Sequence, residues 1–213
     1  MTPVTTYHDL IRWDIFAMIP RPARRILDVG GGIGATSAAA KEFAGADHVV
    51  LIDQVANEAA SGVDIAIPAN LDDIPALQDL LNEHGPFDTI LCLDVLEHLY
   101  DPWRIVSVLD TALAPNGALI ISLPNMNFIG LVGPLVLKGR FDLADSGVMD
   151  RTHIRWFTPQ GGAELACSSG LRLEATSFNI FGRKKQIIDR LTMGKLTRFL
   201  AMQYAFRVRK PAA

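Results

Sequence analysis

The sequence predicts an α/β protein with a doubly wound, mostly parallel sheet and helices on both faces of that sheet. Strand-like and helix-like segments alternate along the chain, which is the pattern of a parallel sheet crossed by helices. The strand-like segments are apolar throughout, as expected where both faces of a sheet are covered. A chain of 213 residues has room for one such core, so we expect a single domain over residues 1–213.

The expected elements follow one another in a regular order. Strands are expected at 25–29, 48–53, 63–67, 89–94 and 118–123, and helices at 6–18, 35–43, 74–82, 101–114 and 159–169. The turns Gly85-Pro86 and Pro115-Asn116-Gly117 end helices and begin strands. A strand at 171–181, a helix at 184–201 and a final strand at 203–208 complete the pattern.

The most informative segment follows the first strand and contains Asp28, Gly30, Gly31, Gly32 and Gly34. Glycines let the backbone turn sharply and approach a ligand closely. The helix that follows would direct its first N–H groups at the same ligand. Asp53 ends the next strand, where a carboxylate can accept hydrogen bonds from both hydroxyls of a ribose. These residues predict a nucleoside-binding site.

The glycines alone do not identify the nucleoside, because they also fit the dinucleotide fingerprint. Asp28 is more informative, since a carboxylate repels a pyrophosphate and suits a ligand with a cationic amino-acid end. A nicotinamide-dependent reductase or epimerase is the alternative from another class. The chain contains no Tyr-x-x-x-Lys pair that would favour it.

Two later motifs accompany the glycine-rich one, Phe-Asp-Thr-Ile-Leu-Cys-Leu-Asp-Val-Leu-Glu-His-Leu at 87–99 and Ala-Pro-Asn-Gly-Ala-Leu-Ile-Ile-Ser-Leu-Pro-Asn at 114–125. In this order the motifs resemble the class I S-adenosylmethionine-dependent methyltransferases, over residues 20–182. The resemblance implies a Rossmann-like seven-stranded sheet whose last strand is antiparallel and lies between its two predecessors. It also implies S-adenosylmethionine as cofactor, bound by Asp28, Gly30, Gly31, Gly32, Gly34, Asp53, Asn70, Leu71, Leu93 and Asp94.

A second cluster is expected from Asp94, Glu97, His98 and the more distant His153. The first three stand at i, i+3 and i+4, so a helix would place them on one face. Two carboxylates and two imidazoles can hold a divalent metal ion, and His98 or His153 can alternatively act as the general base for a hydroxyl. The arrangement is similar to that of Hen-type RNA 2′-O-methyltransferases, with Asp94 in place of the usual Glu, and of ubiquinone-pathway O-methyltransferases.

We expect oxygen as the methyl acceptor, because a hydroxyl benefits most from a general base. The segments around Arg140, Arg151 and Arg155 resemble bacterial methyltransferases of surface-polysaccharide assembly, which implies a small or glycan-like acceptor. The arginines suit an anionic one. The irregular region 125–158 is expected to be a substrate lid. Metal-assisted RNA 2′-O-methylation is the alternative within the same fold.

Charge is unevenly distributed. Residues 183–213 hold nine Lys or Arg and one acid, whereas the rest of the chain holds 11 basic and 22 acidic residues. This basic helix and strand suit an anionic acceptor or peripheral contact with a membrane. A nucleic-acid partner is disfavoured because only this segment is basic. Free thiols at Cys92 and Cys167 and the lack of a targeting segment predict a cytoplasmic protein; nothing in the chain indicates an oligomeric state.

Overall fold

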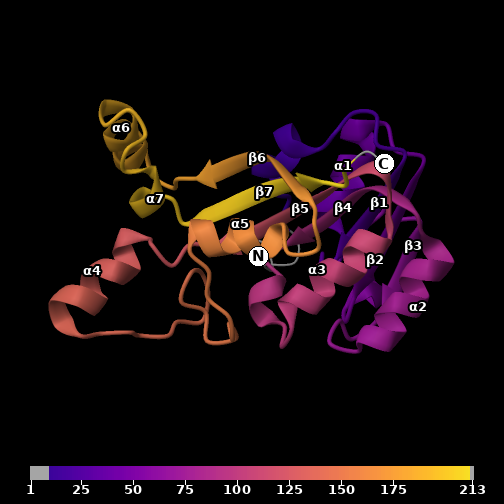
Figure 1. Cartoon of the computed structure of the whole chain (residues 1–213), viewed down its shortest axis with the longest axis horizontal. Coiled ribbons are helices and arrows are strands. Elements are labelled where there is room, and N and C mark those ends of the chain that lie inside the picture. The colour runs from indigo at the N-terminus through magenta and orange to yellow at the C-terminus, as the bar shows by residue number, and fades with distance from the viewer. Residues whose placement is uncertain (1–9, 212–213) are drawn as a thin grey trace, which may run out of the picture.

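The computed structural model of the protein describes residues 10–211. These residues form a seven-stranded sheet in the order β3-β2-β1-β4-β5-β7-β6 (Figure 1). The strands are β1 (Arg25–Val29), β2 (His48–Asp53), β3 (Ile65–Pro68), β4 (Phe87–Leu93), β5 (Leu113–Pro124), β6 (Arg172–Asn179) and β7 (Gln203–Arg209). The first five strands run parallel, whereas β7 is antiparallel to both of its neighbours. The expected topology is therefore confirmed.

Seven α-helices lie within the described residues. They are α1 (Ala35–Ala44), α2 (Ile74–His84), α3 (Pro102–Thr111), α4 (Ile129–Lys138), α5 (Pro159–Ala166), α6 (Arg183–Leu191) and α7 (Thr197–Leu200). Asp73, Asp101 and Thr158 precede α2, α3 and α5, and each side chain accepts a backbone hydrogen bond from the first turn. A proline within that first turn favours each helix start further.

Helices cover both faces of the sheet. Leu27 of β1 packs into an apolar cluster with α2, α3 and α5, whereas its neighbour Ile26 packs into a second cluster with α1 and the 3-10 helix η2 (Trp13–Met18). Successive strand residues point to opposite faces, which is why the central strands are apolar at every position. Because each strand must bury side chains in both clusters, the register between neighbouring strands is fixed, and the carboxyl ends of the parallel strands lie at one edge of the sheet.

Two expected helices differ from the structure. The helix expected at 6–18 is the shorter η2, and residues 6–9 lie outside the described part of the chain. The single helix expected at 184–201 is wrong, because α6 and α7 are separate. Met193 and Gly194 between them have φ angles of 52° and 76°, and such left-handed residues end a right-handed helix.

The region 125–158 is less irregular than expected, because it contains α4. Gly130, Gly133 and Pro134 disfavour a helix in the sequence. Within the described residues, no helix is both long and apolar enough to cross a membrane. Cys92 is buried, Cys167 is half-buried and both are free thiols, as expected.

Candidate active site

The glycine-rich turn joins β1 to α1 at the carboxyl edge of the sheet. Gly30, Gly32 and Gly34 have φ angles of 71°, 62° and 79°, a region that favours glycine. At Gly31 the constraint is space instead, because a Cβ atom there would lie 2.1 Å from Oδ2 of Asp28. The turn therefore presents bare backbone over the Asp28 carboxyl group.

Asp53 holds this turn from the end of β2. Its Oδ2 accepts a hydrogen bond of 2.8 Å from the N–H of Gly32, and its Oδ1 accepts one of 2.9 Å from the N–H of Val55. A carboxylate oxygen has a second acceptor site. Both oxygens can therefore still accept from hydroxyl groups of a ligand.

Asp28 is a buried carboxyl group that lacks a hydrogen-bond donor. It is 1% exposed, and neither oxygen accepts a hydrogen bond from the described residues. The hydroxyl of Ser37 beside it donates to the carbonyl of Gly34. Burial raises the pKa of Asp28 to about 6. An ammonium group of a ligand would supply the missing donors and the missing charge.

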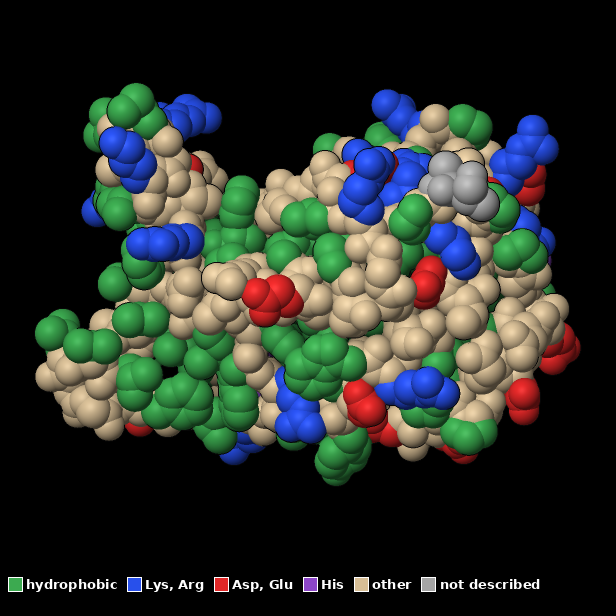
Figure 2. Space-filling view, in the orientation of Figure 1, with side chains coloured by type: hydrophobic (Ala, Val, Ile, Leu, Met, Phe, Trp, Pro, Cys, Tyr) green, Lys and Arg blue, Asp and Glu red, His purple; other side chains and the backbone are tan. Residues whose placement is uncertain are grey.

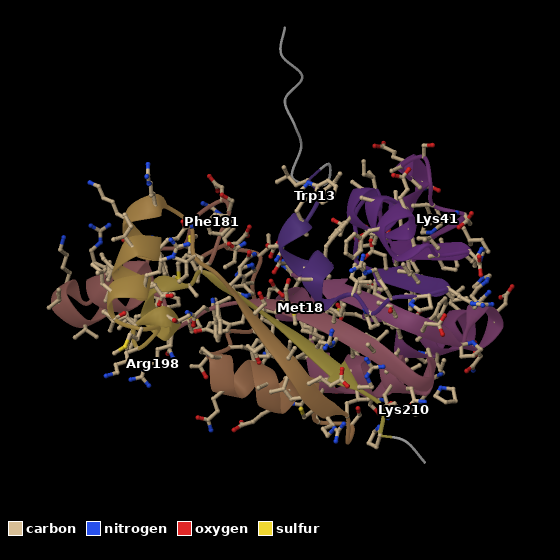
Figure 3. All side chains as sticks on the ribbon, turned by 90° about the horizontal axis from the view of Figure 1, so that it is seen from above. Trp13, Met18, Lys41, Phe181, Arg198 and Lys210 are labelled. Carbon is tan, nitrogen blue, oxygen red and sulfur yellow. The ribbon has the colours of Figure 1, made fainter. Side chains whose placement is uncertain are left out.

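A cavity of about 340 Å³ opens above this carboxyl group. Its lining includes six of the ten residues expected to bind the cofactor, Asp28, Gly30, Gly31, Gly32, Leu93 and Asp94. The remaining lining residues are Leu10, Ile11, Arg12, Asp14, Thr36, Asn179, Phe181 and Gln203, which the sequence did not identify. They come from η2 and the segment before it, from α1, from the end of β6 with the residues that follow it, and from the start of β7. In Figure 3, Trp13 and Phe181 mark the two sides of this region.

Four expected cofactor residues do not line the cavity, namely Gly34, Asp53, Asn70 and Leu71. Gly34 caps α1 and Asp53 reaches the glycine turn from outside the cavity. Asn70 is exposed, and its side chain accepts a hydrogen bond from the N–H of Asp72. Leu71 is buried in the apolar core. Asp53 ends β2, and Asn70 and Leu71 follow the end of β3, so these residues lie at the carboxyl ends of neighbouring strands.

Asp94 follows β4 with a φ angle of 57°, which turns its carboxylate into the cavity. Its Oδ1 accepts a hydrogen bond of 2.8 Å from Ser122, and its Oδ2 accepts one of 3.0 Å from Gln203. Arg12 forms an ion pair with the same carboxylate. Asp94 is thus engaged by groups on the cavity side.

The other three residues of the expected cluster do come together. Glu97, His98 and His153 each direct one potential ligand atom to a common point, with these atoms within 4.8 Å of one another. The backbone carbonyl of Glu97 accepts hydrogen bonds from Ile154 and Arg155, which holds the histidine-bearing loop against the 3-10 helix η4 (Leu96–His98). Asp94 is not among the residues of this cluster.

Hydrogen bonds determine which imidazole nitrogen carries the proton. Nδ1 of His153 lies 3.2 Å from the carbonyl oxygen of Val148, and a carbonyl only accepts. Nδ1 of His98 lies 3.3 Å from the carbonyl oxygen of Thr152. The Thr152 hydroxyl donates to Asp150, so it too accepts from His98. Both histidines are therefore Nδ1 protonated, and the Nε2 lone pair of each is available.

The cluster is also electrostatically unusual. Glu97 is 1% exposed, and neither of its carboxylate oxygens accepts a hydrogen bond within the described chain. Burial, with the nearby charge of Asp94, raises the pKa of Glu97 well above its usual range. Burial and then the neighbouring His98 lower the pKa of His153. A neutral His153 at physiological pH can accept a proton or bind a metal ion.

The arginines expected to bind an anionic acceptor have partners within the chain. Arg140 forms an ion pair with Asp142, and Arg151 forms one with Asp145. Arg155 donates to the carbonyl of Tyr100. An anionic acceptor at these arginines therefore stays a prediction.

Comparison with known proteins agrees with this geometry. A family model described as a methyltransferase domain matches residues 10–176. The chain is 39% identical over 114 residues to a ubiquinone biosynthesis O-methyltransferase of Xylella fastidiosa (strain 9a5c), covering 50% of this chain and 44% of that one. It is 32% identical over 155 residues to the protein of the same name from Coxiella burnetii (strain RSA 331 / Henzerling II), covering 70% and 64%. The chain thus spans less than two thirds of the length of these relatives.

A solved structure is similar over nearly the whole chain. It is a SAM-dependent methyltransferase from Archaeoglobus fulgidus, with a TM-score of 0.63 and 16% identity, covering 92% of this chain and 91% of that one. At this identity the similarity concerns the fold alone.

Proposed function

The chain belongs to the class I S-adenosylmethionine-dependent methyltransferases, and from this premise we propose that it methylates a hydroxyl oxygen of a small-molecule acceptor. The observation that carries the proposal is the cluster of Glu97, His98 and His153, whose potential ligand atoms lie within 4.8 Å of one another and which follows shortly after Asp94 of the cavity lining. The family membership rules out the nicotinamide-dependent alternative. The names of the two curated relatives also support oxygen as the acceptor atom.

We place S-adenosylmethionine across the carboxyl ends of β1 and β2. Asp53 is positioned to accept hydrogen bonds from the ribose hydroxyls, and the glycine turn leaves room for the backbone to approach the ligand. Asp28 would receive the ammonium group of the methionine portion, because its buried carboxyl group accepts no hydrogen bond from residues 10–211. Asn70 and Leu71, which follow β3, are the residues that we expect beside the adenine. Each of these assignments is part of the proposal.

For methyl transfer, the protein mainly has to align the reacting atoms, because the sulfonium group of the cofactor is already activated. The acceptor oxygen attacks the methyl carbon, the carbon–sulfur bond breaks and the sulfur departs as a neutral thioether. Holding oxygen, carbon and sulfur in line supplies most of the acceleration. The hydroxyl proton must leave with the reaction, and the Nε2 lone pair of His98 or His153 can accept it, for a contribution of about 10²–10⁴-fold.

The same cluster fits a divalent metal ion. Metal-bound histidines commonly donate their other ring N–H to an oxygen, as His98 and His153 do here. Glu97 adds a buried carboxylate that accepts no hydrogen bond within the described residues, and its Oε1 lies 3.9 Å from Nε2 of His153. A bound divalent ion would lower the pKa of a coordinated hydroxyl. Because the metal ion and the proton would use the same Nε2 lone pairs, the two roles are alternatives for each histidine.

Kinetics of two histidine variants test the proposal and separate these roles. His98→Ala and His153→Ala should each lower kcat by about 10²-fold or more, with little change in affinity for the demethylated cofactor. His84→Ala, at the end of α2, is the matched control and should leave kcat unchanged. Loss of activity with a chelator and recovery with Mn²⁺ or Zn²⁺ identifies the metal role; a basic limb in the pH–rate profile without metal dependence identifies the base. Wild-type kcat in both variants would contradict both roles.

The acceptor is proposed only as a class. A glycan-like or anionic acceptor, a lid formed by 125–158, a role for the basic segment 183–213 and a cytoplasmic location stay predictions. Screening small phenols, sugars and RNA as methyl acceptors distinguishes these classes. Methylation of RNA in preference to the small molecules would favour the RNA 2′-O-methyltransferase alternative.

A further inference from the structure

One end of the molecule carries an apolar helix that the protein core does not cover. Helix α4 is apolar over nearly all of its length, yet only Leu131 of its ten residues is buried. Val136 is 74% exposed and Leu137 is 82% exposed. A helix that is apolar on all sides is normally buried. Within the described residues, the outer half of α4 therefore lacks an apolar partner.

Helix α6 also projects from the core and exposes apolar side chains. Ile187, Ile188 and Leu191 form one stripe along α6, and all three are exposed. Leu191 is 79% exposed, and Met193 in the turn that follows is 80% exposed. None of the residues of α6 is buried against the sheet. Helix α6 is thus amphipathic with both of its faces directed away from the core.

The two projections lie at the same end of the molecule. Figure 1 shows α4 and α6–α7 leaving one end of the sheet, and the view in Figure 3 also places them together, far from Lys41 and Lys210. Both continue from the carboxyl ends of strands, α4 after β5 and α6 after β6. The Nζ of Lys185 on α6 lies 4.4 Å from the centre of the Phe128 ring, which links the bases of the two projections. We call the surface formed by residues 127–141 and 180–200 the tip surface.

The tip surface is strongly basic. Its eight cationic residues are Lys138, Arg140, Arg183, Lys184, Lys185, Arg190, Lys195 and Arg198, and its one acid is Asp189. Asp189 accepts a hydrogen bond of 2.6 Å from Thr197 and so is engaged within the surface. Figure 2 shows apolar and basic side chains together on the α6–α7 projection and apolar side chains on α4. The covering partner must therefore combine apolar volume with negative charge.

We propose that the tip surface docks on an anionic phospholipid bilayer, with the apolar tips of α4 and α6 entering the interface and the cationic side chains contacting lipid phosphates. Amphipathic helices with apolar and Lys/Arg-rich faces bind membranes in this way, and juxtaposed basic clusters add electrostatic affinity. A second copy of the chain fits less well, because two tip surfaces would bring like charges together. Docking is a binding property and goes beyond the proposed methyl transfer.

The docked orientation would place the catalytic edge close to the bilayer. A cavity of about 200 Å³ opens at the base of α4, lined by Phe128, Gly130, Leu131, Ser146, Gly147, Val148, Met149 and Met202. The carbonyl of Val148 in this lining is the group that orients His153. The bilayer, the apolar cavity and the histidine cluster would thus follow one another along one edge of the protein.

Flotation of the full chain with vesicles tests docking directly. We expect the protein to float with vesicles of phosphatidylcholine mixed with phosphatidylglycerol, but not with pure phosphatidylcholine vesicles, and to be released at high salt. Leu137→Asp with Leu191→Asp, and separately Lys184→Glu with Lys195→Glu, should each lower the vesicle partition coefficient by about tenfold or more. All four side chains are exposed, so the variants should keep the wild-type unfolding temperature.

Matched controls lie outside the tip surface. Leu173→Asp on β6 and Arg24→Glu before β1 change exposed residues in the same chemical way and should leave flotation unchanged. The proposal is overturned if the wild-type protein fails to float with the anionic vesicles, or if the tip variants float as it does. It is equally overturned if sedimentation shows a dimer that Leu137→Asp dissociates. Because flotation needs neither methyl donor nor acceptor, its outcome is independent of the proposed reaction.

Discussion

The guanidinium of Arg12 forms an ion pair with the carboxylate of Asp94, which lies 82 residues later in the chain. Arg12 and Asp94 are 19% and 9% exposed, so the pair is mostly shielded from water. Ser122 and Gln203 complete the bonds to the same carboxylate. The Asp94 side chain thus joins the segment before η2, the end of β4, β5 and β7 at the wall of the cavity above Asp28.

The first prediction concerns this ion pair. Asp94→Asn preserves the shape of the side chain and tolerates the left-handed backbone, but it removes one of the two carboxylates that pair with Arg12, the other being Asp14. We expect the free energy of unfolding in urea to fall by about 1–3 kcal/mol. Arg12→Met together with Asp94→Asn should cost less than the sum of the single changes. Additive costs would show that the pair contributes little.

An exposed ion pair provides the control. Arg140 and Asp142 are 63% and 62% exposed in their pair. Arg140→Met should therefore change the free energy of unfolding by less than about 0.5 kcal/mol.

The second prediction compares two glycines. At Gly31 a Cβ atom would lie 2.1 Å from the carboxyl group of the buried Asp28, so Gly31→Ala should lower the free energy of unfolding by about 2 kcal/mol or more and prevent cofactor binding. At Gly133 in α4 a Cβ atom meets nothing within 4 Å. Gly133→Ala should leave stability unchanged or raise it by less than about 1 kcal/mol. Equal thermal shifts for the two variants would refute the crowding at Gly31.

The third prediction follows from the raised pKa of Asp28. The carboxyl group has a pKa of about 6 in the folded protein, against 3.8 for an unperturbed carboxyl. The folded state therefore binds the proton more tightly, so this group makes the protein less stable as pH rises from about 4 to 6. Urea unfolding as a function of pH should show that decline in the wild type, and it should be smaller in Asp28→Asn.

Ligand binding should depend on pH in the opposite direction. The ammonium group of S-adenosylhomocysteine favours the ionised carboxylate, so the affinity should fall as pH decreases below about 6. Titration calorimetry at several pH values measures this slope. The same slope in Asp28→Asn would show that another group binds the ammonium.

The fourth prediction concerns Asp53. Asp53→Ala removes the acceptor proposed for the ribose and also the bond to the N–H of Gly32, so the Kd for S-adenosylhomocysteine should rise by about tenfold to a hundredfold. Asp79→Ala, on the exposed side of α2, removes a carboxylate elsewhere and should leave Kd unchanged. A Kd for Asp53→Ala within twofold of the wild type would contradict the ribose assignment.

The sequence predicted those parts of the candidate site that are formed by residues adjacent in the chain. Gly30, Gly31 and Gly32, which line the cavity, were predicted because consecutive glycines indicate a tight turn after a strand. Arg12, Asn179 and Gln203 were missed because they reach the cavity from segments far apart in the chain. The pairing of β6 and β7 with the parallel strands brings Asn179 and Gln203 to the cavity, and the segment before η2 brings Arg12.

The errors in secondary structure have physical causes. Between α6 and α7 the left-handed Met193 and Gly194 break a pattern that reads as one helix, although Gly194 was a signal for a helix end. In α4, Gly130 and Pro134 indicated a loop, but the segment is helical. The spacing of Asp94, Glu97 and His98 suggested one helical face, whereas the left-handed backbone at Asp94 turns its carboxylate to Arg12 instead.

Calorimetric titration of the wild-type protein with S-adenosylhomocysteine tests the central assignment most directly. With the proposed contacts of Asp28 to the ammonium group and of Asp53 to the ribose, the titration should show saturable binding of one molecule per chain, with a Kd in the micromolar range. NADH titrated in the same way should give no heat of binding. The absence of S-adenosylhomocysteine binding at millimolar concentration, in protein whose unfolding transition is intact, would contradict the account.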